Sequence, residues 1–165
     1  MPNEAPRELE RLSSWLRSNN ACSDAVEWLQ RQTSIEQAWR ECEHGHWMAW
    51  LVGKLIGGLR PESEERRKLT LAGCKFARLS LCYVEENEAR PERAIELAEL
   101  WARGDKRVSI HGLQAAASAA DAADGADAAS AVLKQCAIIM RGSYPTIRPL
   151  LEARMDNFCE VTHAE

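Results

Sequence analysis

The chain has 165 residues, of which 45% are apolar and 28% charged, a balance typical of a soluble globular protein. Its 25 acidic and 21 basic residues give a net charge of −4, which argues against direct nucleic-acid binding because such proteins usually carry a basic excess. No apolar run approaches the roughly 18 residues of a membrane span, and the polar N-terminus lacks the apolar segment of a secretory signal. We therefore expect a cytoplasmic protein that makes no membrane contact.

Six cysteines are spread along the chain, and no two of them form a C-x-x-C pair. They are Cys22, Cys42, Cys74, Cys82, Cys136 and Cys159. Disulfides are rare in the reducing compartment that we expect. Because Cys74, Cys82 and Cys136 fall within apolar helical patterns, we predict that these three are buried free thiols rather than part of a disulfide framework.

Three short helices are predicted in the first part of the chain. Leucines at three- and four-residue steps predict a helix over 6–18. Ser23 and Asp24 offer an N-cap for a second helix. Ser34 offers an N-cap for a third, with Gln37 at the position that completes a capping box.

Tryptophan is concentrated in the same part of the chain, which holds four of the six indole rings. These are Trp28, Trp39, Trp47 and Trp50. His44-Gly45 predicts a helix break, and an apolar helix is expected over 47–56, closed by Gly57-Gly58. Since an indole is a large apolar ring with a single N–H, we expect these rings to be sealed inside the N-terminal half of the core.

Two longer helices are predicted next. Pro61 opens an amphipathic pattern that continues to about Tyr83. Pro91 suits the first turn of another helix, which runs to about Arg103. Apolar side chains occupy most of the circumference of this second helix. We therefore expect the two helices to form the centre of the fold.

The last part of the chain also predicts helices. Residues 115–131 are rich in alanine, the best helix former, and an apolar face follows over 132–140. A final helix is expected over 146–160. No period-2 pattern of β-branched residues predicts a strand. The expected fold is thus all-α, a single-domain helical bundle of about seven to nine helices over residues 1–165.

One sequence motif has the side chains of a metal site. Cys42, His44 and His46 form C-x-H-x-H, whose alternate residues face the same way in an extended loop but point apart in a helix. Zinc ligands normally come in two pairs at wider spacing, and the sequence has no second pair. The alternative is a polar turn with exposed imidazoles. We predict no metal and no cofactor.

The sequence contains no nucleophile elbow, P-loop or dinucleotide-binding motif. No serine or cysteine is paired with a base in a recognisable catalytic pattern. We therefore predict no catalytic residues and a protein that is not an enzyme.

A group of acidic side chains is the best candidate for a partner-binding surface. It consists of Glu85, Glu86, Glu88, Glu92, Glu96 and Glu99. The first three precede the helix that Pro91 opens, and the others form a stripe along it. Clustered carboxylates can complement a basic surface and speed association, whereas the alternative is an ordinary solvated loop and helix face.

The order of cysteines and tryptophans resembles a family of small helical proteins from bacteria and their phages that are labelled as immunity proteins. The resemblance covers about residues 20–145. Its marks are Ala21-Cys22, residues 25–28, residues 37–39, Cys42, residues 47–51, residues 67–69, residue 72, residues 77–78, Arg90-Pro91, residues 94–96, Trp101-Ala102, residues 136–139 and Tyr144-Pro145. The helix expected over 146–160 is an addition to that pattern.

The resemblance implies a non-enzymatic protein that binds and neutralises a toxin. An alternative is a phage anti-defence protein, similar to an anti-CRISPR, that inhibits a bacterial nuclease complex. A second alternative is a metal-dependent enzyme at Cys42, His44 and His46, and a third is a scaffold that associates through its alanine-rich helix. The first two require a protein partner, either a toxin or a host defence complex.

Overall fold

The computed structural model describes residues 4–83, 86–109 and 130–155, and these residues form an all-α fold without strands. The α-helices are α1 (Glu4–Ser18), α2 (Ser23–Gln30), α3 (Ile35–Glu41), α4 (Gly45–Leu55), α5 (Glu64–Ser80), α6 (Arg90–Ala102), α8 (Ser130–Ser143) and α9 (Arg148–Arg154), and a short 3-10 helix, η1 (Leu81–Tyr83), follows α5. The predicted fold class is confirmed. The alanine-rich stretch over 115–131 lies almost entirely outside the described residues.

No helix in the described part of the chain has both the length and the apolar character that crossing a membrane requires.

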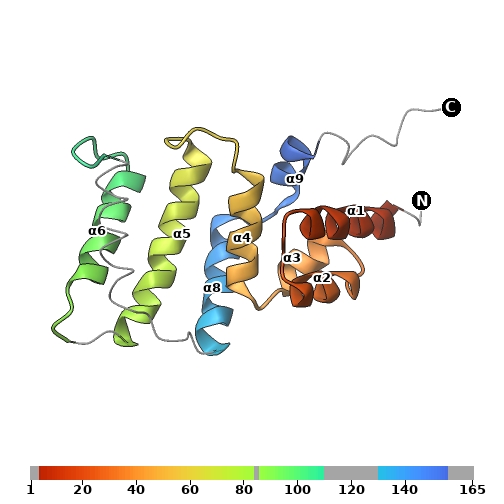
Figure 1. The fold of residues 1–165 in the computed structure, drawn as a ribbon, viewed down its shortest axis with the longest axis horizontal. Helices are drawn as coiled ribbons and strands as arrows, with labels where there is room; N and C mark the ends of the chain where they lie inside the picture. Colours follow the sequence, from red (N-terminus) through yellow and green to blue (C-terminus); the bar gives the residue numbers. More distant parts are fainter. Residues whose placement is uncertain (1–3, 84–85, 110–129, 156–165) are drawn as a thin grey trace.

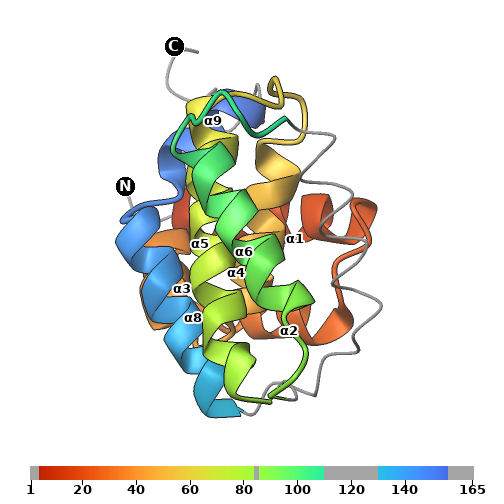
Figure 2. The same ribbon diagram turned by 90° about the vertical axis from the view of Figure 1, so that its left-hand side faces the viewer.

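The helices stand in a row that has α6 at one end and the α1–α3 group at the other (Figure 1). Helix α5 packs against α6 on one side and against α8 and α4 on the other. Seen from the end of the row, α5 lies behind α6, with α8 and α4 to either side (Figure 2). The predicted central place is therefore correct for α5.

The same expectation is wrong for α6, which ends the row of described helices. Only Ile95, Trp101 and Ala102 are buried on this helix. Leu97 and Leu100 are half-buried, because α5 covers one side of α6 only. The apolar residues around α6 thus predicted more burial of this helix than the described helices provide.

Serine caps account for where two of the helices begin. The backbone N–H of Gln37 donates to the Ser34 hydroxyl over 3.1 Å, which confirms the predicted cap of α3. The Gln37 carboxamide oxygen accepts from the backbone N–H of Thr33 rather than of Ser34, so the reciprocal bond of the capping box is displaced by one residue. Helix α5 begins at Glu64, later than expected, because the Ser63 hydroxyl caps it.

Two other predicted boundaries are wrong. Cys22, and not Ser23 or Asp24, occupies the N-cap position of α2, where no side chain makes a capping bond. Helix α9 ends at Arg154. The remainder of the helix expected over 146–160 lies largely outside the described residues.

The predicted helix break is confirmed, because α3 ends at Glu41 and His44 is the N-cap of α4, but Gly45 itself is the first residue of α4. A Cβ at this position would overlap the Cβ of Cys136 and lie 2.5 Å from the backbone nitrogen of Ala137, both on α8. Helices α4 and α8 therefore approach each other backbone to backbone at this point, which only glycine permits.

Arg148, at the start of α9, ties that helix to the N-terminal group. Its two terminal nitrogens each lie 3.1 Å from a carboxylate oxygen of Glu8 on α1. Its Nε donates to Glu36 on α3 over 2.6 Å. Burial acts to raise the pKa of Glu36, but a backbone hydrogen bond and the Arg148 guanidinium outweigh burial and lower it. One arginine thus connects three helices that are distant in sequence.

We predict that Gly45→Ala destabilises the protein by about 1–3 kcal/mol, because the added methyl group forces α4 away from α8. Gly73→Ala is the matched control, since a Cβ on Gly73 of α5 meets nothing within 4 Å. That change should leave the free energy of unfolding equal or raise it by about 0.5–1 kcal/mol. Urea denaturation followed by circular dichroism measures both, and equal effects of the two variants would contradict the close approach.

Arg148→Met should lower the free energy of unfolding at pH 7 by about 1–2 kcal/mol, because Glu8 and Glu36 lose a shared partner. The folded-state pKa of Glu36 is lowered, so its contribution is present above the unfolded pKa and is lost as the pH falls through the folded value. The difference between wild type and variant should therefore shrink in acid.

Denaturation at a series of pH values from neutral to acidic measures this difference. Arg31→Met is the control, since the Arg31–Glu27 pair on α2 is largely exposed, and such pairs contribute little to stability. A gap between wild type and Arg148→Met that is independent of pH would show that the arginine acts through packing and not through its charge.

Candidate functional site

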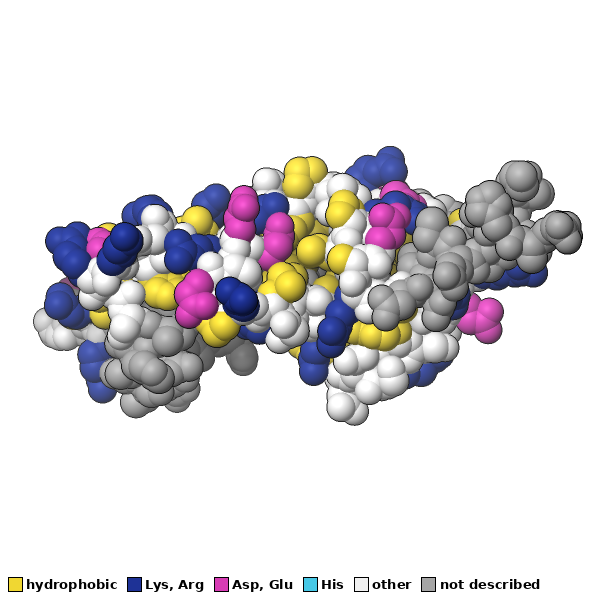
Figure 3. All heavy atoms as spheres, turned by 90° about the horizontal axis from the view of Figure 1, so that it is seen from above, with side chains coloured by type: hydrophobic (Ala, Val, Ile, Leu, Met, Phe, Trp, Pro, Cys, Tyr) yellow, Lys and Arg dark blue, Asp and Glu magenta, His cyan; other side chains and the backbone are white. Residues whose placement is uncertain are grey.

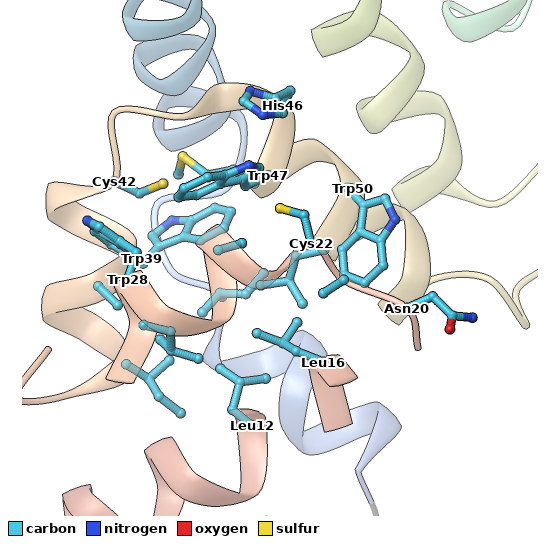
Figure 4. Close-up of a pocket in the computed structure, with 18 residues that line it drawn as sticks. Leu12, Leu16, Asn20, Cys22, Trp28, Trp39, Cys42, His46, Trp47 and Trp50 are labelled. Carbon is cyan, nitrogen blue, oxygen red and sulfur yellow. The ribbon is translucent and has the colours of Figure 1, made fainter. Parts of the chain in front are cut away.

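A pocket of about 570 Å³ opens between the α1–α3 group and α4. We call it the indole pocket, because all four tryptophans of the N-terminal cluster line it (Figure 4). Aliphatic side chains complete its walls, among them Leu12 and Leu16 of α1 and Leu51 of α4. Ile147, which immediately precedes α9, contributes from the C-terminal part of the chain.

Only one of the four indole rings is sealed in the core. Trp39 is 6% exposed, and its Nε1 donates to the backbone oxygen of Tyr144 over 2.8 Å. Trp28, Trp47 and Trp50 are half-buried and line the pocket. The expectation that all four rings are enclosed between helices is therefore wrong for three of them.

The half-buried indole rings are held by contacts with their neighbours. The His44 ring stacks on Trp47, with centroids 3.9 Å apart and an interplanar angle of 26°. Lys54 Nζ lies 5.5 Å from the centroid of the Trp50 ring. Since neither His44 nor Lys54 lines the pocket, these contacts fix the rings from outside it.

A left-handed turn positions the wall formed by α2. Asn20 follows α1 with a φ of 61°, a conformation that asparagine tolerates better than most residues. The backbone N–H of Ala21 donates to the Leu16 oxygen over 3.0 Å and closes the end of the helix. The chain then reverses, which brings Cys22 and Ala25 to the pocket wall.

In the part of the chain that the structure describes, no lysine, arginine, aspartate or glutamate lines the pocket. Partial desolvation, with the nearby His44 ring, lowers the pKa of His46 and so favours its neutral form. Burial raises the pKa of the Cys42 thiol, which is therefore also neutral. On the face seen from above, apolar side chains gather near the middle with charged side chains around them (Figure 3). The described walls of the indole pocket thus carry no carboxylate, ammonium or guanidinium group.

The proposed metal ligands do not converge. Cys42 is buried, and its Sγ lies 3.7 Å from the backbone oxygen of His44. The ring of His44 is engaged by Trp47, while the ring of His46 stands nearly perpendicular to it at 5.8 Å. Among the described residues, no three His, Cys, Asp or Glu side chains are grouped so that they could hold a metal ion. The geometry gives the metal-enzyme alternative no support.

The carboxylates of the predicted acidic surface differ in their surroundings. Glu88 accepts from the Nε of Arg90 over 2.8 Å and from its backbone N–H over 2.9 Å, and these bonds lower the pKa of Glu88 to about 2. Glu99 accepts from Arg78 over 2.7 Å and has a side chain that is only 15% exposed. Glu85 lies outside the described residues, whereas Glu86, Glu92 and Glu96 are exposed. Two of the six carboxylates are therefore already paired with arginine.

The sequence analysis did not indicate that Asn20, Cys22 and Ala25 line a pocket. The available signal was the placement of small residues beside tryptophans, as with Ala25 and Trp28 on adjacent turns of α2. A large ring beside a methyl group leaves space unless a third element fills it. No third element fills this space in the described part of the chain.

No protein-family model matches the chain, and no characterised protein or solved structure is significantly similar to it. The resemblance to immunity proteins therefore stays a prediction.

Thiol labelling tests the burial that defines the pocket. The predicted burial is correct for Cys74 and Cys136 but wrong for Cys82, which is exposed in the short 3-10 helix after α5. Cys22 and Cys82 are both exposed and should react with iodoacetamide in the native protein. Cys42, Cys74 and Cys136 are buried, and burial raises the pKa of each thiol, to about 11 for Cys74. These three should react only upon unfolding, because the thiolate is the reactive form.

Peptide mass spectrometry after timed labelling at pH 8 distinguishes the two groups of thiols. Labelling in urea provides the control for intrinsic reactivity. Native labelling of Cys42 as fast as that of Cys22 would contradict the burial of Cys42.

Proposed function

We propose that this protein is a non-enzymatic binding protein and that the indole pocket is its binding site for a small, largely apolar molecule. The observation that carries the proposal is a concave space of about 570 Å³ walled by indole and aliphatic side chains. Ligand pockets in proteins commonly measure about 300–1,000 Å³ and are mostly apolar, with few polar groups. A position between helices of a bundle is one of their usual places.

The energetics of water in the pocket support the same proposal. Ordered water inside a protein needs about two to four polar partners, and the side chains that line the pocket offer few besides Asn20 and His46. A ligand that replaces this water with apolar contact gains roughly 25 cal/mol for each Å² of apolar surface that is buried. The pocket therefore favours an apolar occupant over solvent.

The chemistry of the lining side chains supports binding rather than catalysis. The Cys42 S–H faces a backbone oxygen and its pKa is raised, so it is a poor nucleophile. No carboxylate of a described residue lines the pocket to orient the His46 imidazole as a general base. The lining thus offers contact surface without a nucleophile and base in partnership.

Neutralisation of a toxin, or of a bacterial nuclease complex, stays a prediction from the sequence. It has less support than ligand binding, because Glu88 and Glu99 of the expected acidic surface pair with arginines of this chain. An exposed apolar side chain of a protein partner is smaller than the pocket, whereas a small-molecule ligand fits its dimensions.

We predict that the wild-type protein binds the fluorescent probe N-phenyl-1-naphthylamine, with a blue shift of its emission, and that Ala25→Phe weakens this binding at least tenfold. Ala25 is half-buried on the pocket wall, so the added ring occupies the ligand space. Ala89→Phe is the control, since Ala89 is exposed ahead of α6, at the far end of the row of helices.

Fluorescence titration measures the affinity, and urea denaturation verifies that each variant is folded. The proposal fails if the wild-type protein does not bind the probe. It also fails if a folded Ala25→Phe variant binds as well as wild type.

A further inference from the structure

The electrostatics of the indole pocket restrict the kind of molecule that it can hold. Among the described residues, no lysine, arginine, aspartate or glutamate contributes to its walls. An ion that enters such a site loses its hydration and finds no opposite charge, which costs several kcal/mol. The pocket therefore selects against a ligand whose charged group would lie inside it.

Two basic side chains lie at or beside the pocket, and neither places a fixed charge on its walls. Lys54 is exposed and places its ammonium over the ring of Trp50. The His46 side chain is exposed at the pocket wall, and partial desolvation with the neighbouring His44 lowers its pKa, which disfavours its charged form. An acid could reach Lys54 only with its carboxylate outside the pocket, because Lys54 is not a lining residue.

The walls also favour a planar aromatic ligand over an aliphatic one. His44 covers one face of Trp47 from outside the pocket, so the opposite face is the one turned to the ligand space. Trp28 lies beside this ring, with centroids 6.3 Å apart and an interplanar angle of 56°. Aromatic pairs in offset-stacked or edge-to-face arrangement gain about 0.5–1.5 kcal/mol beyond the burial of area.

Figure 4 shows Trp47 and Trp50 on two sides of the same space, with Cys22 drawn between them. These rings come from one helix, α4, whereas Trp28 comes from α2. A flat ligand can therefore contact indole surface contributed by two separate helices. An aliphatic molecule of equal area would bury the same surface without these aromatic contacts.

We propose that the indole pocket binds an uncharged, planar aromatic molecule. This inference rests on the proposed function, since it names the class of ligand for the same site.

Four matched compounds test the inference with the full chain. Naphthalene-2-methanol is neutral, naphthalene-2-carboxylate is an anion and naphthalene-2-methylammonium is a cation, all on the same ring system. Decahydronaphthalene-2-methanol is the saturated counterpart of the alcohol. Displacement of N-phenyl-1-naphthylamine reports the affinity of each compound at pH 7. The aromatic alcohol should bind at least tenfold more tightly than either ion and at least threefold more tightly than the saturated alcohol.

A pair of tryptophan variants supplies an independent readout. Trp47→Leu keeps an apolar wall but removes the ring, and should abolish the preference for the aromatic over the saturated alcohol. Trp15→Leu is the matched control, since Trp15 is a half-buried tryptophan on α1 that does not line the pocket. That variant should keep the preference of wild type.

The remaining outcomes separate this inference from the proposed function. Tightest binding of either ion, or equal binding of the two alcohols, overturns the inference and leaves ligand binding in place. Displacement by none of the four compounds, when the probe itself binds, also overturns it. Failure of the probe to bind overturns the proposed function together with the inference.

Discussion

Helix α8 contacts the segment that connects α3 to α4, and the shape of the N-terminal half depends on these contacts. Arg141 of α8 donates to the backbone oxygen of Cys42 over 2.7 Å. Gly45 allows the start of α4 to rest directly on the backbone of α8. The Trp39 indole donates to Tyr144, immediately beyond the same helix. Two contacts on α8 and one immediately beyond it thus set the angle between α3 and α4, and the indole pocket lies within that angle.

These contacts place the tryptophans in two different environments, the core and the pocket wall. Trp39 is tied to the chain beyond α8 and lies in the core. Trp47 and Trp50 follow Gly45 on α4, and the fixed start of that helix carries them to the side that faces α1 and α2. Alanines on the opposing wall, such as Ala25 and Ala38, are too small to reach the rings and fill the space. The pocket is the geometric result of large rings opposite small side chains on helices that cannot close further.

Local features of the fold could be predicted from the sequence, whereas its spatial arrangement could not. The Ser34 cap follows from two residues three positions apart, Ser34 and Gln37, and from hydrogen-bond chemistry, and the structure confirms it. The role of Gly45 depends on Cys136, which is remote in sequence, so the same glycine could only be interpreted as a break. The place of α6 and the pairing of Glu99 with Arg78 likewise depend on how α5 and α6 pack.

Ion pairs that join the helices around the pocket also explain why the described pocket walls carry no charged side chains. Three carboxylates of the N-terminal part of the chain pair with basic side chains of α8 and α9. Arg148 of α9 pairs with Glu8 of α1 and Glu36 of α3, and Lys134 of α8 pairs with Glu43 over 2.8 Å. Because these carboxylates are paired away from the indole rings, none of them is left to line the pocket or to attract a cation into it. The ion pairs that join the helices thus leave dispersion, apolar burial and ring contacts as the main forces available to a ligand.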